Sequence, residues 1–480
     1  MNRVVNILCF ILLLSVPAIV KGQSGISMYH LQNTTFQGNN FNPSFIPEGK
    51  LFLGLPLLSG IALDYNSRAS YNDIVIKENG RKIWNTEGFA SLMKKRNYVS
   101  LEADISTFYL GVRANETTAF SLFVNEKMAG RAFGSKDIIT LALEGNAGFI
   151  GKEIDFSKVA VDARYYREIG IGYWKHLPKK KLSMGVRVKY LIGIFNASSD
   201  NNFDGKATLS DDNFNMAFNF KNATFNTSGV DLFSDGSSAD IQSHMIGNGN
   251  TGFGIDLGAN WKITKELSAA VAWNDIGFIN WKVDPKNYTL QDTTFNYGGL
   301  ILKDIEDFQQ SLEDSISERF QRHETTNPYK TALNSRFYSS LSYKIDPKST
   351  LTATIANHGV SRRLRMLYGV GYSRKFGKVL TVSGNVVKSP QRGLNLGLAY
   401  AIDLGSFQYY MASDKLLGVA DATNLSAMDI RFGINFIFGR NKVSSGNPED
   451  GNKQDGEKIY QKIPLQKPRE IYEKKTFQEY

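Results

Sequence analysis

The chain has 480 residues, of which 42% are hydrophobic and 12% aromatic, and it carries a formal charge of +10. This length allows either about two or three soluble domains or one large β-barrel. Lysine and arginine are spread along the chain rather than clustered on one element, which argues against nucleic-acid binding. The only cysteine, Cys9, lies in the first segment, so the sequence predicts a mature chain without disulfides, thiolate nucleophiles or Cys-ligated metal.

Residues 1–22 have the pattern of a secretory signal peptide. Arg3 precedes an apolar run over residues 4–20, and small or polar residues follow it at positions 21–23. We expect cleavage just before Gln23, with an uncleaved anchor as the alternative. After residue 22, no apolar run reaches the roughly 20 residues that a membrane-spanning helix needs.

Residues 23–97 differ from the rest of the chain and are predicted to form an N-terminal plug or collar. Prolines at positions 43, 47 and 56 argue against central strands in this part. The segment holds the motif Asn42-Pro43-Ser44, and Asn85 is placed to cap a short helix over residues 88–95.

Between residues 98 and 439, apolar and polar side chains alternate along many short segments, such as 108–112, 139–143 and 394–402. Successive side chains of a strand point to opposite faces, so this period predicts strands. About 14 such segments occur, each near the roughly 10-residue length of a tilted membrane strand. The predicted fold class is therefore all-β, a single transmembrane antiparallel β-barrel; a soluble β-sandwich would show the same alternation.

Loop lengths favour the barrel over the sandwich. Counting back from the last strand, every second connection is tight, at 404–405, 375–378, 346–349, 264–265 and 178–181. The connections between them include two long segments, 195–249 and about 275–331. Outer-membrane barrels keep short turns on the periplasmic side and long loops outside. The second long loop is predicted to contain an amphipathic helix, because Ile305, Phe308, Leu312, Ile316 and Phe320 recur at helical spacing.

Charged residues on the polar faces of these strands are the candidate site residues. On a lipid face, each Arg or Lys near the membrane midplane would cost roughly 2–4 kcal/mol. We therefore expect them to line the lumen, either as a network of salt bridges that fills it or as a polar path with a binding site beneath the plug. These residues are Asp162, Arg164, Glu168, Arg187, Lys189, Asp256, Lys262, Arg336, Lys344, Asp403, Asp429 and Arg431.

The last patterned stretch has the form of a barrel-closing strand. Arg431, Gly433, Phe436 and Phe438 follow the order polar residue, glycine, then two aromatic residues two positions apart. This order resembles the signal that closes bacterial outer-membrane barrels and that the barrel-assembly machinery reads. Residues 440–480 are polar, of mixed charge and interrupted by prolines, and are predicted to be a disordered periplasmic tail.

A search for catalytic or metal-binding patterns finds none that stands above background. The five histidines do not form the paired helical spacing of a zinc protease, and the chain has no Gly-x-Ser-x-Gly nucleophile elbow. We therefore predict a protein that is not an enzyme and that uses no cofactor and no metal.

The chain as a whole resembles the outer-membrane barrels of Bacteroidota, within an uncharacterised family that has an early Asn-Pro motif followed by Gly-Leu-Pro, here Asn42-Pro43 and residues 54–56. The motif and the strand number also resemble the FadL-type transporters of long-chain fatty acids. In their motif, alanine usually stands where this chain has Ser44. That resemblance implies an N-terminal hatch within the barrel and passive transport of hydrophobic small molecules in the bacterial outer membrane.

Two functional hypotheses follow. In the first, a plugged barrel takes up hydrophobic molecules passively, and the plug is displaced on binding. In the second, a barrel that transports nothing docks a secretion, gliding or surface partner through its long loops or its periplasmic tail. The expected partners are outer-membrane lipid, the barrel-assembly machinery and, under the second hypothesis, a periplasmic or surface protein.

Overall fold

The computed structural model describes residues 25–440 except 158, 200–202, 211–215, 222, 231–245, 248, 291–292, 298–321, 358–365, 390–392 and 417–425. The expected signal peptide, the amphipathic loop helix and the C-terminal tail lie outside the described residues. Within them, no helix is long and apolar enough to cross a membrane.

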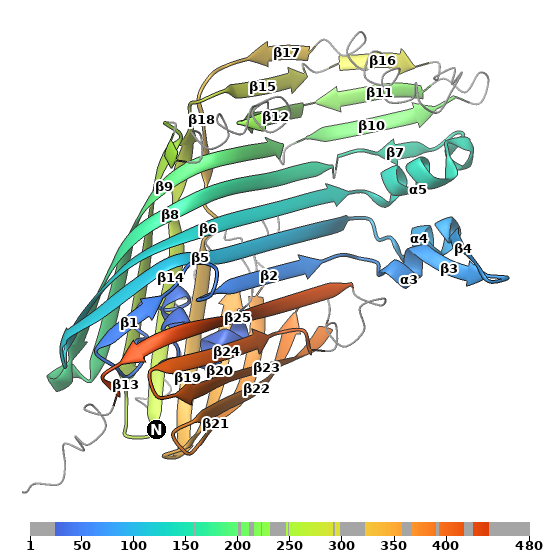
Figure 1. The fold of residues 1–480 in the computed structure, drawn as a ribbon. Coiled ribbons are helices and arrows are strands. Elements are labelled where there is room, and N and C mark those ends of the chain that lie inside the picture. The colour runs from blue at the N-terminus through green and yellow to red at the C-terminus, as the bar shows by residue number, and fades with distance from the viewer. Residues whose placement is uncertain are drawn as a thin grey trace, which may run out of the picture.

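The described chain forms a closed antiparallel barrel of 14 strand positions (Figure 1). The all-β prediction and the strand number are confirmed. Thirteen positions are long single strands: β5 (Asn97–Asn115), β6 (Thr118–Gly134), β8 (Ala160–Leu177), β9 (Leu182–Ser199), β13 (Thr251–Lys262), β14 (Leu267–Trp281), β19 (Arg336–Asp346), β20 (Ser349–Asn357), β21 (Met366–Phe376), β22 (Leu380–Ser389), β23 (Gly393–Leu404), β24 (Phe407–Ser413) and β25 (Ala427–Phe438).

The fourteenth position is shared by two short strands, β1 (Leu51–Gly54) and β2 (Ile61–Asn66), which lie end to end. Each pairs with β25 on one side and β5 on the other, and together they close the barrel. This corrects the expectation that residues 23–97 form only a plug. The prolines there had argued against central strands, but Pro56 lies in the break between β1 and β2, where no ladder bond is needed.

A second correction concerns residues 139–143, which were predicted to be a strand. They belong to helix α5 (Lys136–Glu144), whose N-cap Ser135 accepts a hydrogen bond from the Ile138 N–H at 3.1 Å. Three alternating apolar residues fit a helix as well as a strand when the run is this short. The predicted helix after Asn85 is confirmed as α4 (Thr86–Leu92), with the Asn85 side chain accepting from Gly88.

The tight connections all lie at one end of the barrel, here called the turn end, as the alternation of loop lengths predicts. Small elements extend the other, loop end; α3, α4 and the β3–β4 hairpin project there beyond β2 and β5 (Figure 1). The small elements of the loop end are β3 (Val75–Glu78), β4 (Arg81–Trp84), β7 (Glu153–Asp155), β10 (Asp204–Leu209), β11 (Met216–Lys221), β12 (Ala223–Ser228), β15 (Pro285–Leu290), β16 (Thr293–Tyr297), β17 (Arg322–Thr325), β18 (Tyr329–Ala332), α3 (Tyr71–Ile74) and η2 (Ala147–Phe149), in addition to α4 and α5.

The two faces of the wall differ as the two-residue period requires. Outward side chains are apolar and exposed: Ile171 is 63% exposed and Val370 54%. Inward side chains at the alternate positions of the strands are polar and buried: Lys189 is 2% exposed and Asp256 1%. The apolar residues therefore form an outer belt, and the interior is enclosed and polar.

Candidate functional site

Residues 25–50, which we call the plug, lie inside the barrel. They contain helix α2 (Ile26–His30), the 3-10 helix η1 (Phe36–Asn40) and the chain that leads to β1. Apolar plug residues pack on a wall patch made mostly of alanine and tyrosine. The plug side of this cluster is Ile26, Met28, Tyr29, Leu31, Phe41 and Phe45, and the wall side includes Ala270, Ala272, Tyr338, Ala356, Ala399, Ala401, Tyr410 and Ala412.

Hydrogen bonds fix the first turn of the plug to the wall. The backbone N–H groups of Ile26 and Ser27 donate to the Asp414 carboxylate at 2.8 and 2.6 Å. The Ser27 hydroxyl donates to the Ser413 carbonyl at 2.9 Å and accepts from the Asn385 amide at 2.7 Å. Because these donors and acceptors are buried, leaving any of them unpaired would cost about 1–3 kcal/mol.

Two titratable side chains of α2 are buried with the plug. Tyr29 shares a 2.9 Å hydrogen bond with the Ser340 hydroxyl, and burial raises the pKa of Tyr29 to about 12. His30 Nε2 lies 2.8 Å from the Thr354 hydroxyl. Burial lowers the pKa of His30 to about 4, against the opposing effect of the Asp414 charge. Both residues are therefore neutral at pH 7.

The Asn42-Pro43-Ser44 motif forms a tight turn pressed against the wall. Asn42 Oδ1 accepts from the backbone N–H and the hydroxyl of Ser44 at 2.9 and 2.7 Å. Trp174 Nε1 donates to the Ser44 carbonyl at 2.8 Å. A Cβ atom at Gly185 or Gly258 would collide with this turn, at Pro43 or Asn42 respectively, so wall glycines let the motif approach closely. The Ser44 hydroxyl adds a bond within the turn that alanine could not make.

Two arginines of the wall donate to the plug. Arg187 Nη1 donates to Asn40 Oδ1 at 2.7 Å, and its guanidinium lies 3.8 Å from the centre of the Phe123 ring. Arg113 donates to the carbonyls of Gly49 and Pro47 at 3.0 and 2.9 Å. Their acceptors are neutral, and among the described residues no ion pair joins plug to wall.

One buried group of wall charges is paired internally. Lys189 Nζ lies 2.9 Å from Asp256, 3.4 Å from Glu168 and also contacts Asp275. Arg336 bonds Asp275 at 2.7 Å, and Arg187 lies 3.6 Å from Asp256. The three cations and three carboxylates balance. Buried ions each carry a desolvation cost of several kcal/mol, which only such mutual pairing offsets.

The other predicted lumen residues fall into three places. Asp162 bonds Arg164 and also lies 3.7 Å from Arg131, which in turn contacts Glu102. Arg431 bonds Asp429 at 2.8 Å in β25. Lys262, Lys344 and Asp403 are not part of these buried groups; they lie at the turn end around an open cavity.

Asp275, the acid shared by Lys189 and Arg336, was missed by the sequence reasoning, which placed it in a loop. The β13–β14 register shifts between Ile255 and Leu257, so Asn274 and Asp275 both stand opposite Asp256. Asp275 adopts a positive φ of 59° there. A β-bulge of this kind turns consecutive residues inward, which strict alternation cannot foresee. The signal that could have found it is the Asn-Asp pair itself, which tolerates that backbone conformation.

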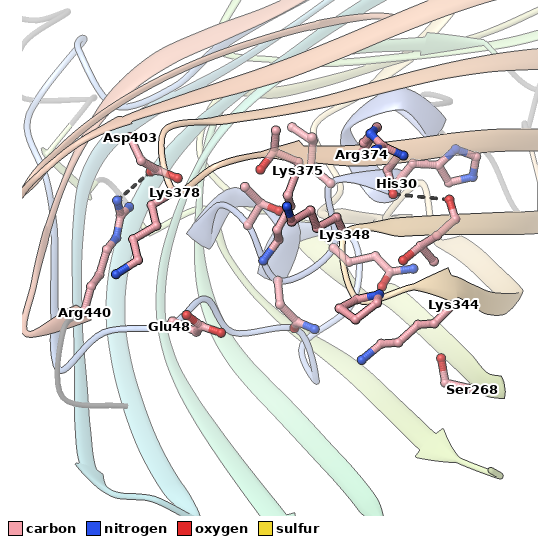
Figure 2. A pocket seen from close by; sticks show the side chains of 18 of the residues that line it. His30, Glu48, Ser268, Lys344, Lys348, Arg374, Lys375, Lys378, Asp403 and Arg440 are labelled. Atoms are coloured by element: carbon pink, nitrogen blue, oxygen red, sulfur yellow. Dashed lines mark hydrogen bonds and ion pairs between the residues drawn. The ribbon is translucent and has the colours of Figure 1, made fainter. Parts of the chain in front are cut away.

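The cavity at the turn end, which we call the vestibule, has a volume of about 990 Å³. Plug residues His30 to Thr34 form part of its lining, together with the turns of the wall. Figure 2 shows Lys344, Lys348, Lys375 and Lys378 around it, with Glu48 on the plug chain.

The residues of the closing signal have separate structural places. Arg431 points inward and is buried, while Phe438 is 40% exposed on the outside. The Phe436 ring packs edge-on against Phe407 with centroids 6.0 Å apart. A Cβ at Gly433 would lie 2.6 Å from the Ser59 carbonyl oxygen, so glycine is required where the break between β1 and β2 passes β25.

No group of acidic, histidine or cysteine side chains in the described part of the chain could hold a metal ion. What the site offers is a closed lumen: a plug held by hydrogen bonds and apolar packing, a wall whose buried Lys189 cluster is paired internally, and a cationic vestibule beneath.

Comparison with known proteins identifies a family. The profile of a family of unknown function, DUF5723, matches residues 43–414. No curated protein matches the chain.

Solved structures similar to this one include two toluene transporters and a FadL homologue, all at low identity. The toluene transporter TbuX of Ralstonia pickettii is 9% identical, with 88% of this chain and 99% of that chain covered and a TM-score of 0.40. The toluene transporter TodX of Pseudomonas putida is 11% identical, with 87% and 98% covered and a TM-score of 0.39. A FadL homologue of Pseudomonas aeruginosa is 11% identical, with 88% and 99% covered and a TM-score of 0.41.

Proposed function

The chain belongs to DUF5723, a family of unknown function, and we propose that it is an outer-membrane barrel whose plug moves aside to admit small molecules passively. The outer apolar belt would meet lipid, and the turn end would face the periplasm, where barrels of this type keep their short turns. The enclosed polar interior would be the route.

The observation that carries the proposal is that buried ion pairs lie within the wall, whereas the plug is bound to the wall by hydrogen bonds. Buried charges of the wall pair with other wall residues, as Lys189 does with Asp256 and Glu168. Polar contacts between plug and wall are hydrogen bonds rather than ion pairs among the described residues. Wall arginines donate to neutral oxygens of the plug, and N–H groups of the plug donate to the Asp414 carboxylate. Water can replace such bonds at a net cost of about 0.5–1.5 kcal/mol for a neutral pair and about 1.5–3 kcal/mol where Asp414 or an arginine takes part. The plug can therefore leave without breaking a buried ion pair of the wall, while water takes over its bonds to Asp414 and Arg113.

The cargo that we propose is a hydrophobic small molecule. When the plug moves, the alanine-rich wall patch around Ala270, Ala356 and Ala399 loses its covering of Ile26, Met28 and aromatic rings. That patch would then be an apolar surface inside an otherwise polar lumen. An apolar molecule can bind there in place of the plug, at roughly 25 cal/mol per Å² of apolar area buried.

A disulfide that locks the plug tests the proposal. A Cβ at Gly397 would contact Ser27 Oγ, so the substitutions Ser27→Cys and Gly397→Cys place two thiols within bonding range. The assay is uptake of a hydrophobic dye by cells that carry the barrel in an intact outer membrane. We expect the oxidised double variant to take up no more dye than cells without the barrel, and a reductant to restore uptake.

The single variant Ser27→Cys is the matched control and should respond to neither treatment. Equal uptake by the oxidised and reduced double variant would contradict gating by the plug.

The docking alternative has one observation in its favour. At the loop end, the β3–β4 hairpin exposes Trp84 by 73%, with Ile76 and Ile83 beside it at 38% and 36%. Exposed apolar groups that cluster in this way mark interaction surfaces in many proteins. Docking would replace transport if two results were obtained together. The first is that locking the plug leaves dye uptake unchanged. The second is that Trp84→Ser, and not the lock, removes a surface-exposed partner from affinity purification.

A further inference from the structure

The vestibule carries an excess of positive charge among the residues that the structure describes. Eight lysines and arginines line it against three carboxylates, Glu48, Glu266 and Asp403. We propose that it is a binding site for a small molecule that carries two or more phosphate or carboxylate groups. The proposal does not depend on movement of the plug.

The two arginines of the vestibule are already paired. Arg440 bonds Asp403 at 2.6 Å, and Arg374 lies 3.7 Å from Asp346. The cations that remain are lysines. Within the part of the chain that the structure describes, five of them have no ion-pair partner: Lys262, Lys344, Lys348, Lys375 and Lys378.

These lysines come from three separate turns and converge on one space (Figure 2). Lys262 ends β13. Lys344 lies near the end of β19 and Lys348 in the β19–β20 turn, while Lys375 lies near the end of β21 and Lys378 in the β21–β22 turn. Lys344 lies close enough to Lys262 and Lys375 for their charges to act on it. Like charges held together in a concave site concentrate the field there and attract anions.

The shape and chemistry of the vestibule define the ligand class. Its volume of about 990 Å³ is at the upper end of the range for small-molecule sites. Lysine ammonium groups act as point charges rather than planar forks, so they recognise total charge on either phosphate or carboxylate. Gln32, Asn33 and Thr34 of the plug supply polar lining. A compact, hydrophilic polyanion therefore fits better than an apolar or singly charged molecule.

Binding can be measured by isothermal titration calorimetry on the full chain in detergent micelles at low salt. The probes are tripolyphosphate and citrate, which separate phosphate from carboxylate as the source of charge. We expect one probe or both to bind with one site per chain, more weakly as salt rises. The double variant Lys344→Gln/Lys375→Gln should bind at least tenfold more weakly.

The matched control is Lys179→Gln/Lys180→Gln, which removes the same charge at the same end but outside the vestibule. It should bind as the native chain does, and thermal unfolding should show that both variants are folded. The proposal is wrong if neither probe binds, or if both double variants lose the same affinity. Binding of a hexaglutamate peptide in the absence of binding by either probe would also overturn it, in favour of an acidic protein partner.

Discussion

At the scale of single residues, the plug depends on side chains that must stay neutral. His30 is 3% exposed, with Nε2 beside the Thr354 hydroxyl and Nδ1 without a hydrogen-bond partner among the described residues. Protonation would place a charge in this space, where only Asp414 provides a compensating field. The stability of the docked plug therefore depends on pH through the His30 imidazole.

The pKa of His30 is lowered from its ordinary 6.5 to about 4 by burial, so the neutral form is favoured when the plug is docked. Its contribution to stability is complete above pH 6.5 and is lost as the pH falls from 6.5 towards 4. At pH 4.5 we expect the docked state to be weaker by on the order of 2 kcal/mol. Thermal unfolding at pH 7.5 and 4.5 measures this.

His30→Gln keeps a neutral nitrogen near Thr354 but cannot titrate. Its unfolding temperature should therefore change less between the two pH values than that of the native chain. An identical pH dependence in both proteins would assign the effect to other groups.

At the scale of elements, the break between β1 and β2 is the irregular point of the wall. Between Gly54 and Ile61 the chain leaves the ladder, and Ser59 turns inward, where Gln37 and Tyr410 donate to its carbonyl at 2.5 and 3.1 Å. Gly433 of β25 lies directly against this carbonyl. The closing signal and the break in the first wall strand are therefore one packing unit.

Gly433→Ala should destabilise the barrel, because its Cβ would lie 2.6 Å from the Ser59 carbonyl oxygen. Overpacking against backbone costs about 1–3 kcal/mol. The control is Gly384→Ala in β22, where a Cβ would meet nothing within 4 Å, so no loss is expected. Unfolding midpoints of the two variants give the comparison, and similar values for both would contradict the steric role of Gly433.

How far the sequence predicts the structure also becomes clear at this scale. Alternation over long segments determines which side chains face inward, and Lys189, Asp256 and Arg336 are examples. It fails where the backbone departs from the regular ladder. The bulge at Asp275, the interrupted pair β1 and β2, and the short helix α5 all depend on tertiary contacts or on local capping that a two-residue period does not contain. The vestibule was not predicted, because its lysines come from three turns that only the closed barrel brings together.

At the scale of the whole molecule, the plug and the wall meet at a defined boundary in the sequence. The plug ends before Leu51, while β1 and β2, within residues 51–66, are part of the wall and pair with both β25 and β5. A deletion that extends through residue 66 would remove the strands that close the barrel and leave two unpaired edges. A deletion of residues 26–48 removes the plug alone.

We expect the chain without residues 26–48 to fold and to conduct ions in planar lipid bilayers, because the buried ion pairs around Lys189 lie within the wall. A chain without residues 26–66 should neither unfold cooperatively nor form stable channels. The loss of apolar contact between plug and wall should lower the unfolding temperature of the shorter deletion relative to the native chain. If that deletion instead folds but stays closed to ions, elements other than the plug seal the lumen, and displacement of the plug is not sufficient for passage.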